Sequence, residues 1–364
     1  MAVDADGRTG ALTIDLGALA RNYRRLRQLA APAECGAVVK ADAYGLGLEP
    51  VARRLAREGC RSFFVASLAE GQALRAVLRD PQHRIYVFEG VSAGRAATLE
   101  AARLVPVLNS IEQVEAWAGR RGAAALHIDT GMSRLGLSAE EVAALAARPR
   151  LLAGLEIDCV MTHLACADEA SHPLTRKQLE RFAELRALLP PARTSIGASA
   201  AIFRGADHCG DLVRPGIGLY GGNPFADRPN PLEPVVTLEA QILQIRRIGE
   251  ACTVGYGATY DADPPATLAV VGVGYADGYP RSLGNRAFAA LGDRRVPVVG
   301  RVSMDLLCLD VSDVPPAEAA VGRWVELFGR RVSVDEVASA AGTISYEVLT
   351  RLGARLRRVY RDGD

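Results

Sequence analysis

Apolar and polar positions follow two patterns along this 364-residue chain. Between residues 37 and 222, short apolar runs are separated by longer stretches with helical periodicity. Strand, loop and helix repeated in this way predict a (β/α)8 TIM barrel of the α/β class. A doubly wound open sheet has the same periodicity and remains the alternative. The eight predicted strands are residues 37–40, 63–67, 84–90, 104–109, 124–131, 154–165, 194–199 and 212–222.

Capping sequences mark where several barrel helices begin. A Ser or Thr followed three residues later by Glu or Gln satisfies two backbone amides in the first turn of a helix. Such sequences follow four of the apolar runs, and a helix is expected to begin at each of Ser67, Ser110, Ser138 and Thr175.

Beyond residue 231 the pattern changes to the alternation typical of β-strands, with Gly, Pro and Asp between the segments. Only residues 333–342 look helical there, after a capping box at Ser333. We therefore expect a barrel at 11–232 and a β-strand-rich C-terminal domain at 233–364. Residues 1–10, and part of the segment GALTIDL that begins at Gly10, are expected to associate with this second domain.

Composition narrows the class of protein. The net charge of +1 gives no electrostatic reason to bind nucleic acid or an anionic membrane. The N-terminus is polar and acidic, unlike a signal peptide, and no apolar run approaches the ~18 residues of a membrane span. The seven cysteines are scattered and form no C-x-x-C pair, which indicates a reducing, cytoplasmic location. No His, Cys or acidic spacing resembles a metal site, so none is predicted.

Lys40 draws attention because the chain has only one other lysine, Lys177, in a charged helical segment. Lys40 ends a buried apolar run, where an ammonium group loses its hydration. From this segment alone, two interpretations of Lys40 are equally supported. Either it is a surface substitution or one member of a buried ion pair, or it is an amine nucleophile with a lowered pKa.

The barrel prediction indicates where the active site lies, because the active sites of such barrels are at the carboxyl ends of the strands. Ser199 and the backbone amides of 216–218 are suited to hold a phosphate. A lysine beside a phosphate site suggests a Schiff base to pyridoxal 5′-phosphate (PLP). The polar residues expected at this end of the barrel are Lys40, Tyr44, Asp129, Arg134, His163, Ser199 and Arg214.

Eight sequence blocks carry a resemblance to a known family. In chain order they are VVKADAYGLG, HIDTGMSRLG, MTHLACAD, VRPGIGLYG, VGYGATY, GYADGYPR, GRVSMD and TISYEV. With these blocks the chain resembles alanine racemase, a fold-type III PLP enzyme, along essentially its full length. The resemblance implies an isomerase that interconverts L-alanine and D-alanine and supplies D-alanine for peptidoglycan.

The resemblance also implies a role for each matching residue. Two bases would act on opposite faces of the substrate: Lys40, which also carries PLP, and Tyr256, which the partner subunit of a homodimer supplies. Arg214 would face the pyridine nitrogen, and His163 would position Arg214 and Tyr256. Arg134 would bind the substrate carboxylate. The remaining matches would hold the phosphate (Tyr44, Ser199, Gly216, Ile217 and Tyr346) or line the substrate entrance from the partner subunit (Met304 and Tyr275).

The chain departs from the family pattern near the site. Many members have, at position 127, a lysine whose carbamate braces the carboxylate-binding arginine, whereas this chain has His127. The brace for Arg134 is then a neutral His127, an anion such as chloride, or a water, and the sequence does not choose. Ala198 replaces a frequent Asn, and Asp42 and Leu46 replace a common Asn and His.

Several alternatives stay open. Taken singly, Tyr256, His163 and Met304 are ordinary packed side chains, and Arg134 is able to pair with Asp129. The alternative functions are a racemase of serine or of a broader range of amino acids, a related PLP decarboxylase, and a non-catalytic PLP-binding protein. The block VGYGATY, which supplies a second base, disfavours a decarboxylase, and the β-rich domain disfavours a single-domain PLP carrier.

Overall fold

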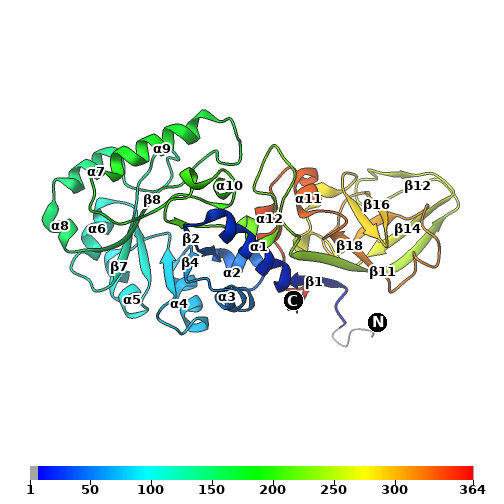
Figure 1. The fold of residues 1–364 in the computed structure, drawn as a ribbon. Coiled ribbons are helices and arrows are strands. Elements are labelled where there is room, and N and C mark those ends of the chain that lie inside the picture. Colours follow the sequence, from blue (N-terminus) through cyan, green and yellow to red (C-terminus); the bar gives the residue numbers. More distant parts are fainter. Residues whose placement is uncertain (1–6, 364) are drawn as a thin grey trace. The chain divides into compact units, whose positions relative to one another are not determined.

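The computed structural model describes residues 7–363, and the chain divides into two compact units (Figure 1). The barrel unit comprises Ala20–Leu219 and Asn223–Pro231, and the C-terminal unit contains the rest of the described chain. Strand β1 (Gly10–Asp15) falls in the C-terminal unit. The domain limits at residues 11 and 233 remain predictions. Of the N-terminal segment 1–10, residues 1–6 lie outside the described part.

Parallel strands form the core of the barrel unit. The seven strands of its main sheet lie side by side in chain order, and every neighbouring pair is parallel. In order they are β3 (Ala37–Val38), β4 (Ser62–Val65), β5 (Arg84–Val87), β6 (Val105–Leu108), β7 (Ala123–His127), β8 (Glu156–Met161) and β9 (Arg193–Ser195). Strands β4 and β6 are fully buried because helices cover the outer face, whereas β8 and β9 begin with charged, partly exposed residues.

Backbone hydrogen bonds close this sheet into a barrel. Strand β10 (Leu212–Val213) pairs in parallel with β2 (Glu34–Cys35). Just beyond it, the Arg214 amide donates to the Gly197 carbonyl (2.7 Å), and the Val38 amide donates to the Pro215 carbonyl (2.9 Å). The segment after β10 is therefore bonded to both edges, which confirms the barrel and excludes the open sheet.

Helices surround the barrel strands, as the capping sequences indicated (Figure 1). The hydroxyls of Ser67, Ser110 and Ser138 each accept an amide three residues later, and Ser138 forms a complete capping box. The helices of this region are α1 (Leu16–Ala30), α2 (Lys40–Gly45), α3 (Leu48–Arg57), α4 (Leu68–Val77), α5 (Ala96–Ala101), α6 (Ile111–Trp117), α7 (Ala139–Ala146), α8 (Pro149–Ala153), α9 (Pro173–Arg186) and α10 (Ser199–Ile202), with 3-10 turns η1 (Ala93–Arg95), η2 (Ala206–His208) and η3 (Ile217–Tyr220).

One helix start and several strand ends were predicted wrongly. Helix α9 begins before Thr175, because Pro173 suits the first helical position and the His172 ring accepts the Leu174 amide as the cap. Several predicted strands are also too long, because the chain leaves the sheet for loops and turns earlier than the apolar runs end. The predicted strand 212–222 is only β10 (Leu212–Val213), followed by the 3-10 turn η3, and the predicted strands 124–131, 154–165 and 194–199 end at His127, Met161 and Ser195. The predicted first strand 37–40 ends at Val38 in β3, and Lys40 opens the short helix α2. Lys40 therefore stands just past its strand rather than in it.

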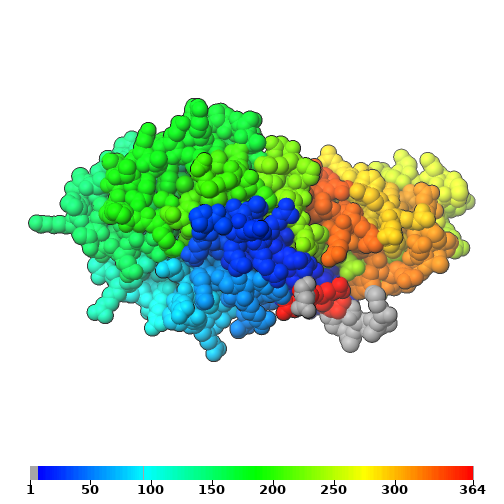
Figure 2. Space-filling model, viewed as in Figure 1, coloured from blue at the N-terminus to red at the C-terminus, as the bar shows by residue number. Residues whose placement is uncertain are grey.

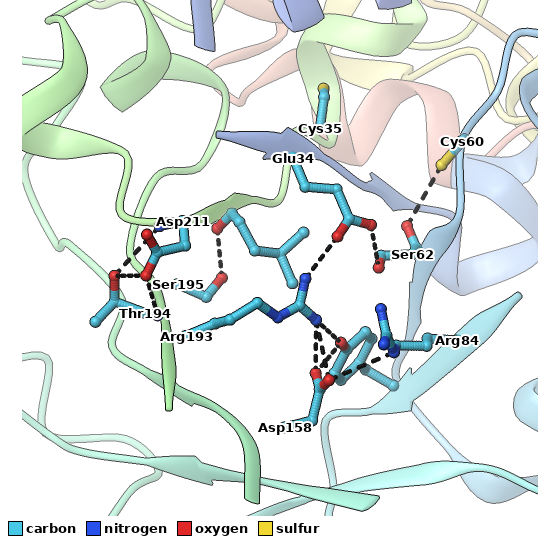
Figure 3. A network of polar contacts seen from close by, with 12 residues as sticks. Glu34, Cys35, Cys60, Ser62, Arg84, Asp158, Arg193, Thr194, Ser195 and Asp211 are labelled. Atoms are coloured by element: carbon cyan, nitrogen blue, oxygen red, sulfur yellow. Dashed lines mark hydrogen bonds and ion pairs between the residues drawn. The ribbon is translucent and has the colours of Figure 1, made fainter. Parts of the chain in front are cut away.

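A polar network lies near the amino ends of the barrel strands (Figure 3). Arg193 of β9 forms ion pairs with Glu34 of β2 (2.6 Å) and Asp158 of β8 (2.8 Å). The Ser62 hydroxyl of β4 donates to the other oxygen of Glu34 (2.6 Å). Because β2 and β9 flank β10, the Arg193–Glu34 pair connects strands across the barrel closure.

The C-terminal unit is built on an eight-stranded sheet in the order β14-β17-β16-β15-β18-β11-β1-β19. Its expected helix α11 (Val334–Ala341) is capped by Ser333, and a second helix, α12 (Ser345–Thr350), was not predicted. Strand β1, within GALTIDL, pairs antiparallel with β11 and parallel with β19. The other elements are β11 (Val236–Ile248), β12 (Cys252–Thr253), β13 (Asp261–Ala262), β14 (Ala266–Val271), β15 (Phe288–Leu291), β16 (Arg294–Val299), β17 (Leu307–Asp310), β18 (Trp324–Phe328), β19 (Arg357–Arg361), η4 (Tyr275–Asp277) and η5 (Arg281–Leu283).

In the barrel unit, helix α1 lies beside residues from the end of the barrel sequence, although the two segments are distant along the chain. In Figure 2, the blue surface of α1 lies beside green residues from the end of the barrel. Beneath the surface, the buried Asn22 amide group donates to the Leu219 carbonyl (3.4 Å). Between residues 7 and 363, no helix has both the length and the apolar character needed to cross a membrane.

Candidate active site

Lys40 is partly buried at the carboxyl end of the barrel strands. Its amino group lies 5.8 Å from the centroid of the Phe88 ring. Burial lowers the pKa of Lys40, and the positive charge of Arg134 lowers it further, while Glu70 acts in the opposite direction. The amine therefore releases its proton more readily than an exposed lysine.

Lys40 leads directly into an unusual backbone turn. The residues 41–44 all have positive φ, between 52° and 58°, although none of them is glycine. At the far end of the turn, the carboxylate of Asp42 accepts the Leu48 amide (2.7 Å). An Asn has the same acceptor oxygen, so Asp42 keeps this bond despite its departure from the family pattern. Leu46, the other departure in this loop, is fully buried.

Ser199, Gly216 and Tyr44 converge at a second point of the barrel end. The Ser199 hydroxyl accepts the amides of Gly216 (3.0 Å) and Gly218 (3.1 Å). A Cβ atom on Gly216 would lie 2.2 Å from the Tyr44 hydroxyl oxygen, so this close approach requires glycine. Ile217 follows in the buried turn η3. Hydroxyls and amides that converge in this way suit an anion such as phosphate.

Arg214 places a positive charge inside the barrel. It is only 4% exposed, and its guanidinium donates to the Ser195 hydroxyl (2.6 Å) and to the carbonyls of Thr162 (2.7 Å) and Ile196 (3.3 Å). These acceptors are neutral, so they orient the charge without cancelling it. Burial lowers the pKa of Arg214 to about 10, which still leaves the group ionised at neutral pH.

His163 lies against this guanidinium and is held neutral. Burial, followed by the charges of Arg214 and Arg134, lowers the pKa of His163 to about 3. Its Nδ1 atom is 3.4 Å from Nη2 of Arg214, which has only protons to offer. Nδ1 is therefore the acceptor, and the ring proton resides on Nε2.

His127, at the end of β7, is also neutral. Burial and the charge of Arg214 lower the pKa of His127 to about 4. Nδ1 lies 2.8 Å from Oδ1 of Asn109, whose amide group donates to the carbonyls of Val107 (2.7 Å) and Phe88 (3.0 Å). Because Asn109 thus offers an acceptor, His127 carries its proton on Nδ1 and keeps a lone pair on Nε2.

Arg134 belongs to the loop after β7 and is exposed. Asp129 shapes this loop by accepting the amides of Gly131 (2.9 Å), Met132 (2.9 Å) and Ser133 (3.0 Å). Partial burial raises the pKa of Asp129, but these bonds outweigh it, so the pKa lies below its usual value. The carboxylate thus serves the loop backbone, and the Arg134 charge acts on Lys40, His127 and His163.

The remaining predicted residues belong to the C-terminal unit and expose much of their side chains. Tyr256, between β12 and β13, is 70% exposed, and Tyr346 of α12 is 38% exposed. Tyr275 and Met304 come together because the amides of Tyr275 and Ala276 donate to the carbonyls of Ser303 (3.0 Å) and Met304 (2.9 Å). All four residues belong to the C-terminal unit, whereas the other predicted site residues belong to the barrel unit.

The barrel thus gathers cationic and donor groups suited to an anionic ligand. Lys40, Arg134 and Arg214 share one electrostatic environment with His163. Within residues 7–363, no group of three His, Cys, Asp or Glu side chains is arranged to hold a metal ion.

Two residues of this site escaped the sequence analysis. Glu70 was taken only as part of a capping box, yet its carboxylate accepts the Ala41 amide (2.8 Å). Asn109 was taken only as the end of a strand, yet it fixes the tautomer of His127. Their positions after β4 and β6 were a usable signal, because polar residues after barrel strands face the site.

Comparison with known proteins agrees with this geometry. Residues 14–224 match the family model "Alanine racemase, N-terminal domain", and residues 235–360 match "Alanine racemase, C-terminal domain". An alanine racemase from Rhodospirillum rubrum is 50% identical over 98% of this chain and 96% of its own length. A protein named "Alanine racemase, catabolic" from Mesorhizobium japonicum is 48% identical over 97% of this chain and 93% of its own.

Solved structures give the same result. Alanine racemase from Bartonella henselae, described with covalently bound pyridoxal phosphate, has a TM-score of 0.92 and 40% identity, covering 97% of this chain and 99% of its own. The biosynthetic alanine racemase from Pseudomonas aeruginosa has a TM-score of 0.91 at the same identity and coverage. The two family models together span nearly the whole sequence, and the chain therefore belongs to the alanine racemase family.

Proposed function

We propose that this protein is a PLP-dependent alanine racemase that interconverts L-alanine and D-alanine. The observation that carries the proposal is Lys40, a partly buried amine with a lowered pKa. It belongs to the same barrel end as a buried guanidinium and an amide-lined anion cradle. The relative from Bartonella henselae, which holds PLP covalently, supports this assignment.

The residues present fit PLP, which offers an aldehyde, a ring nitrogen and a phosphate. Lys40 would hold the aldehyde carbon covalently through Nζ, with the aldehyde oxygen released as water. Ser199, Tyr44 and the amides at Gly216 and Ile217 would hold the phosphate, with Tyr346 of the C-terminal unit. A Cβ on Gly216 would collide with the Tyr44 hydroxyl, so only glycine lets this backbone lie so close to that hydroxyl. Bound there, PLP would withdraw electrons from the substrate and acidify its Cα–H bond.

Racemisation needs proton transfer on both faces of the substrate Cα. Lys40 Nζ would take or return the proton on one face, and its lowered pKa favours the neutral amine that this role requires. Tyr256 Oη would act on the opposite face. Its 70% exposure leaves the hydroxyl accessible for this task.

The arginines would orient the ligands rather than move protons, since a guanidinium stays protonated near neutral pH. Arg134, exposed beside Lys40, would bind the substrate carboxylate. Arg214 would direct one of its donors to the ring nitrogen and keep that nitrogen unprotonated. Neutral His163 would orient Arg214 through Nδ1 and could donate from Nε2.

We further propose that the enzyme is a homodimer. Tyr256, Tyr275 and Met304 expose large side chains on the C-terminal unit. The partner subunit would supply Tyr256 as the second base, and its Tyr275 and Met304 would line the substrate entrance.

Racemase activity is tested by incubating the PLP-loaded protein with L-alanine in heavy water. We expect the circular dichroism of the amino acid to decay to zero and deuterium to appear at Cα. Borohydride should fix PLP on Lys40 and leave Lys177 unmodified, as read by peptide mass. A constant signal without deuterium would exclude alanine. Serine and other amino acids would then be tried, and inertness toward all of them would leave a non-catalytic PLP-binding protein.

In the cell, we propose that the enzyme works in the cytoplasm and supplies D-alanine for peptidoglycan. All seven cysteines are free thiols, which supports a reducing compartment. The relative named catabolic gives a second candidate role, the degradation of alanine. A deletion strain that needs D-alanine to grow would support supply, whereas a strain that fails only with alanine as nitrogen source would support degradation.

A further inference from the structure

We propose that Glu70 is a positioning residue that holds the left-handed turn connecting Lys40 to Tyr44. The role in catalysis rests on the proposed function, whereas the role in holding the turn stands on the geometry alone. Glu70 belongs to α4, outside the residues assigned to PLP or substrate.

The turn needs an external support. Ala41, Asp42, Ala43 and Tyr44 all adopt left-handed φ and ψ values, with φ of 52–58° and ψ of 36–53°. In this conformation the Cβ of an L-residue crowds the following carbonyl oxygen, so consecutive non-glycine residues rarely adopt it. Strained backbone persists only where surrounding contacts over-determine it.

Glu70 supplies such a contact through both carboxylate oxygens. Oε1 accepts the amide of Ala41 (2.8 Å), the first residue of the turn, and Oε2 accepts the amide of Ala66 (2.7 Å), just after β4. The carboxylate thus connects the chain after β3 to the chain after β4. In an ordinary capping box it would return to the amide of the N-cap residue, here Ser67. The two oxygens instead accept the amide of Ala41 in the turn and the amide of Ala66, the residue before Ser67.

The far end of the turn is also fixed. The Asp42 carboxylate accepts the Leu48 amide (2.7 Å), and the Asp42 carbonyl accepts the Gly47 amide (2.9 Å). The turn held by these attachments follows Lys40 directly, and it places the Tyr44 hydroxyl close to the Gly216 backbone. Release of the Glu70 end would therefore change how the amine and the phosphate cradle are placed relative to each other.

Glu70→Gln tests the proposal, because an amide side chain has one acceptor oxygen and cannot accept both backbone amides. We expect hydrogen exchange of the peptide covering 37–47 to accelerate about tenfold or more, since each lost bond is charge-assisted. Glu141→Gln is the matched control, because Glu141 completes the capping box of α7. It should leave exchange in 37–47 unchanged.

The second measurement is PLP affinity of the apo-protein, followed by absorbance. Glu70→Gln should weaken it about tenfold or more. Ala41→Gly should restore much of that loss, because Ala41 is exposed and glycine adopts a φ of 53° without strain. An effect of the Glu70 charge alone would not be rescued by this glycine.

Wild-type exchange in Glu70→Gln would overturn the proposal. Faster exchange with unchanged PLP affinity, or weakened affinity that Ala41→Gly does not rescue, would overturn the positioning role. Failure of the proposed function has a different signature: the wild-type protein would bind PLP and show a Glu70-dependent turn, yet leave L-alanine unchanged.

Discussion

At the scale of single residues, Gly216 shows how a missing atom defines the site. Its backbone approaches Tyr44 so closely that a Cβ would lie 2.2 Å from the hydroxyl oxygen. Gly216 was predicted to belong to a phosphate loop because it lies in the eighth apolar run, 212–222. The need for glycine there could not be read from the sequence, because Tyr44 is distant along the chain.

Gly216→Ala should therefore weaken PLP binding about tenfold or more and lower the unfolding free energy by about 1–3 kcal/mol, the usual cost of overpacking. Gly249→Ala is the matched control, because a Cβ there meets nothing within 4 Å. Fluorescence titration with PLP and urea unfolding measure the two effects. Equal behaviour of both variants would show that the Tyr44 contact yields without cost.

His127 gives a second prediction, based on pH. Its folded pKa of about 4 lies below the ordinary value of about 6.5, so between these values the unfolded chain binds more protons than the folded one. Stability should therefore fall as the pH drops through this window, by about 2 kcal/mol between pH 7 and pH 5 from His127 alone.

His127→Gln should remove this part of the pH dependence, as measured by urea unfolding at both pH values. His163, with a folded pKa of about 3, would keep its own contribution in both proteins. If wild type and variant lost stability in parallel between pH 7 and pH 5, the neutral state of His127 would be wrong.

At the scale of elements, the sequence predicted helices best where a local signal exists. Ser67, Ser110, Ser138 and Ser333 each cap a helix as expected. Helix α12 lacks such a signal, since its N-cap residue is Ile344 and makes no side-chain bond. Its neighbour α11 packs against it, and that tertiary contact is invisible in the sequence.

The barrel closure is a second feature that local pattern could not supply. Arg193 and Glu34 meet across β10, although they are distant along the chain. Asp158, the other partner of Arg193, has only 9% of its side chain exposed. Figure 3 shows both carboxylates directed toward the Arg193 guanidinium.

Arg193→Ala should lower the unfolding free energy by about 2–4 kcal/mol. Glu34 loses the Arg193 cation, and Asp158 keeps only its longer ion pair with Arg84 (3.4 Å). Arg53→Ala is the control: Arg53 pairs with Glu49 on α3 with both side chains at least half exposed, so about 0.5 kcal/mol or less is expected. Urea unfolding measures both variants. Similar small losses would mean that the closure does not depend on this ion pair.

At the scale of the whole molecule, the predicted site residues divide between two units. Lys40, Arg134, His163, Ser199 and Arg214 belong to the barrel, whereas Tyr256, Tyr275, Met304 and Tyr346 belong to the C-terminal unit. The sequence blocks predicted both groups of residues. The sequence pattern does not show whether one subunit or two subunits contribute these groups to a single active site. That question belongs to the assembly.

Subunit mixing answers it. Lys40→Ala and Tyr256→Phe should each be nearly inactive as pure proteins. If the partner supplies Tyr256, co-refolding equal amounts gives hybrid dimers with one intact site, and about a quarter of wild-type activity should return. If one chain supplies both residues, every site carries a substitution and no activity returns. Mixing each variant with itself is the control.

The position of β1 has a consequence for how the protein is made. The ribosome makes β1 before both of its neighbours in the sheet, because β11 and β19 begin only at Val236 and Arg357. While the barrel sequence is being made, β1 therefore has neither β11 nor β19 to pair with. Until β19 has been made, the nascent chain must therefore keep the unpaired edge of β1 from pairing with other strands.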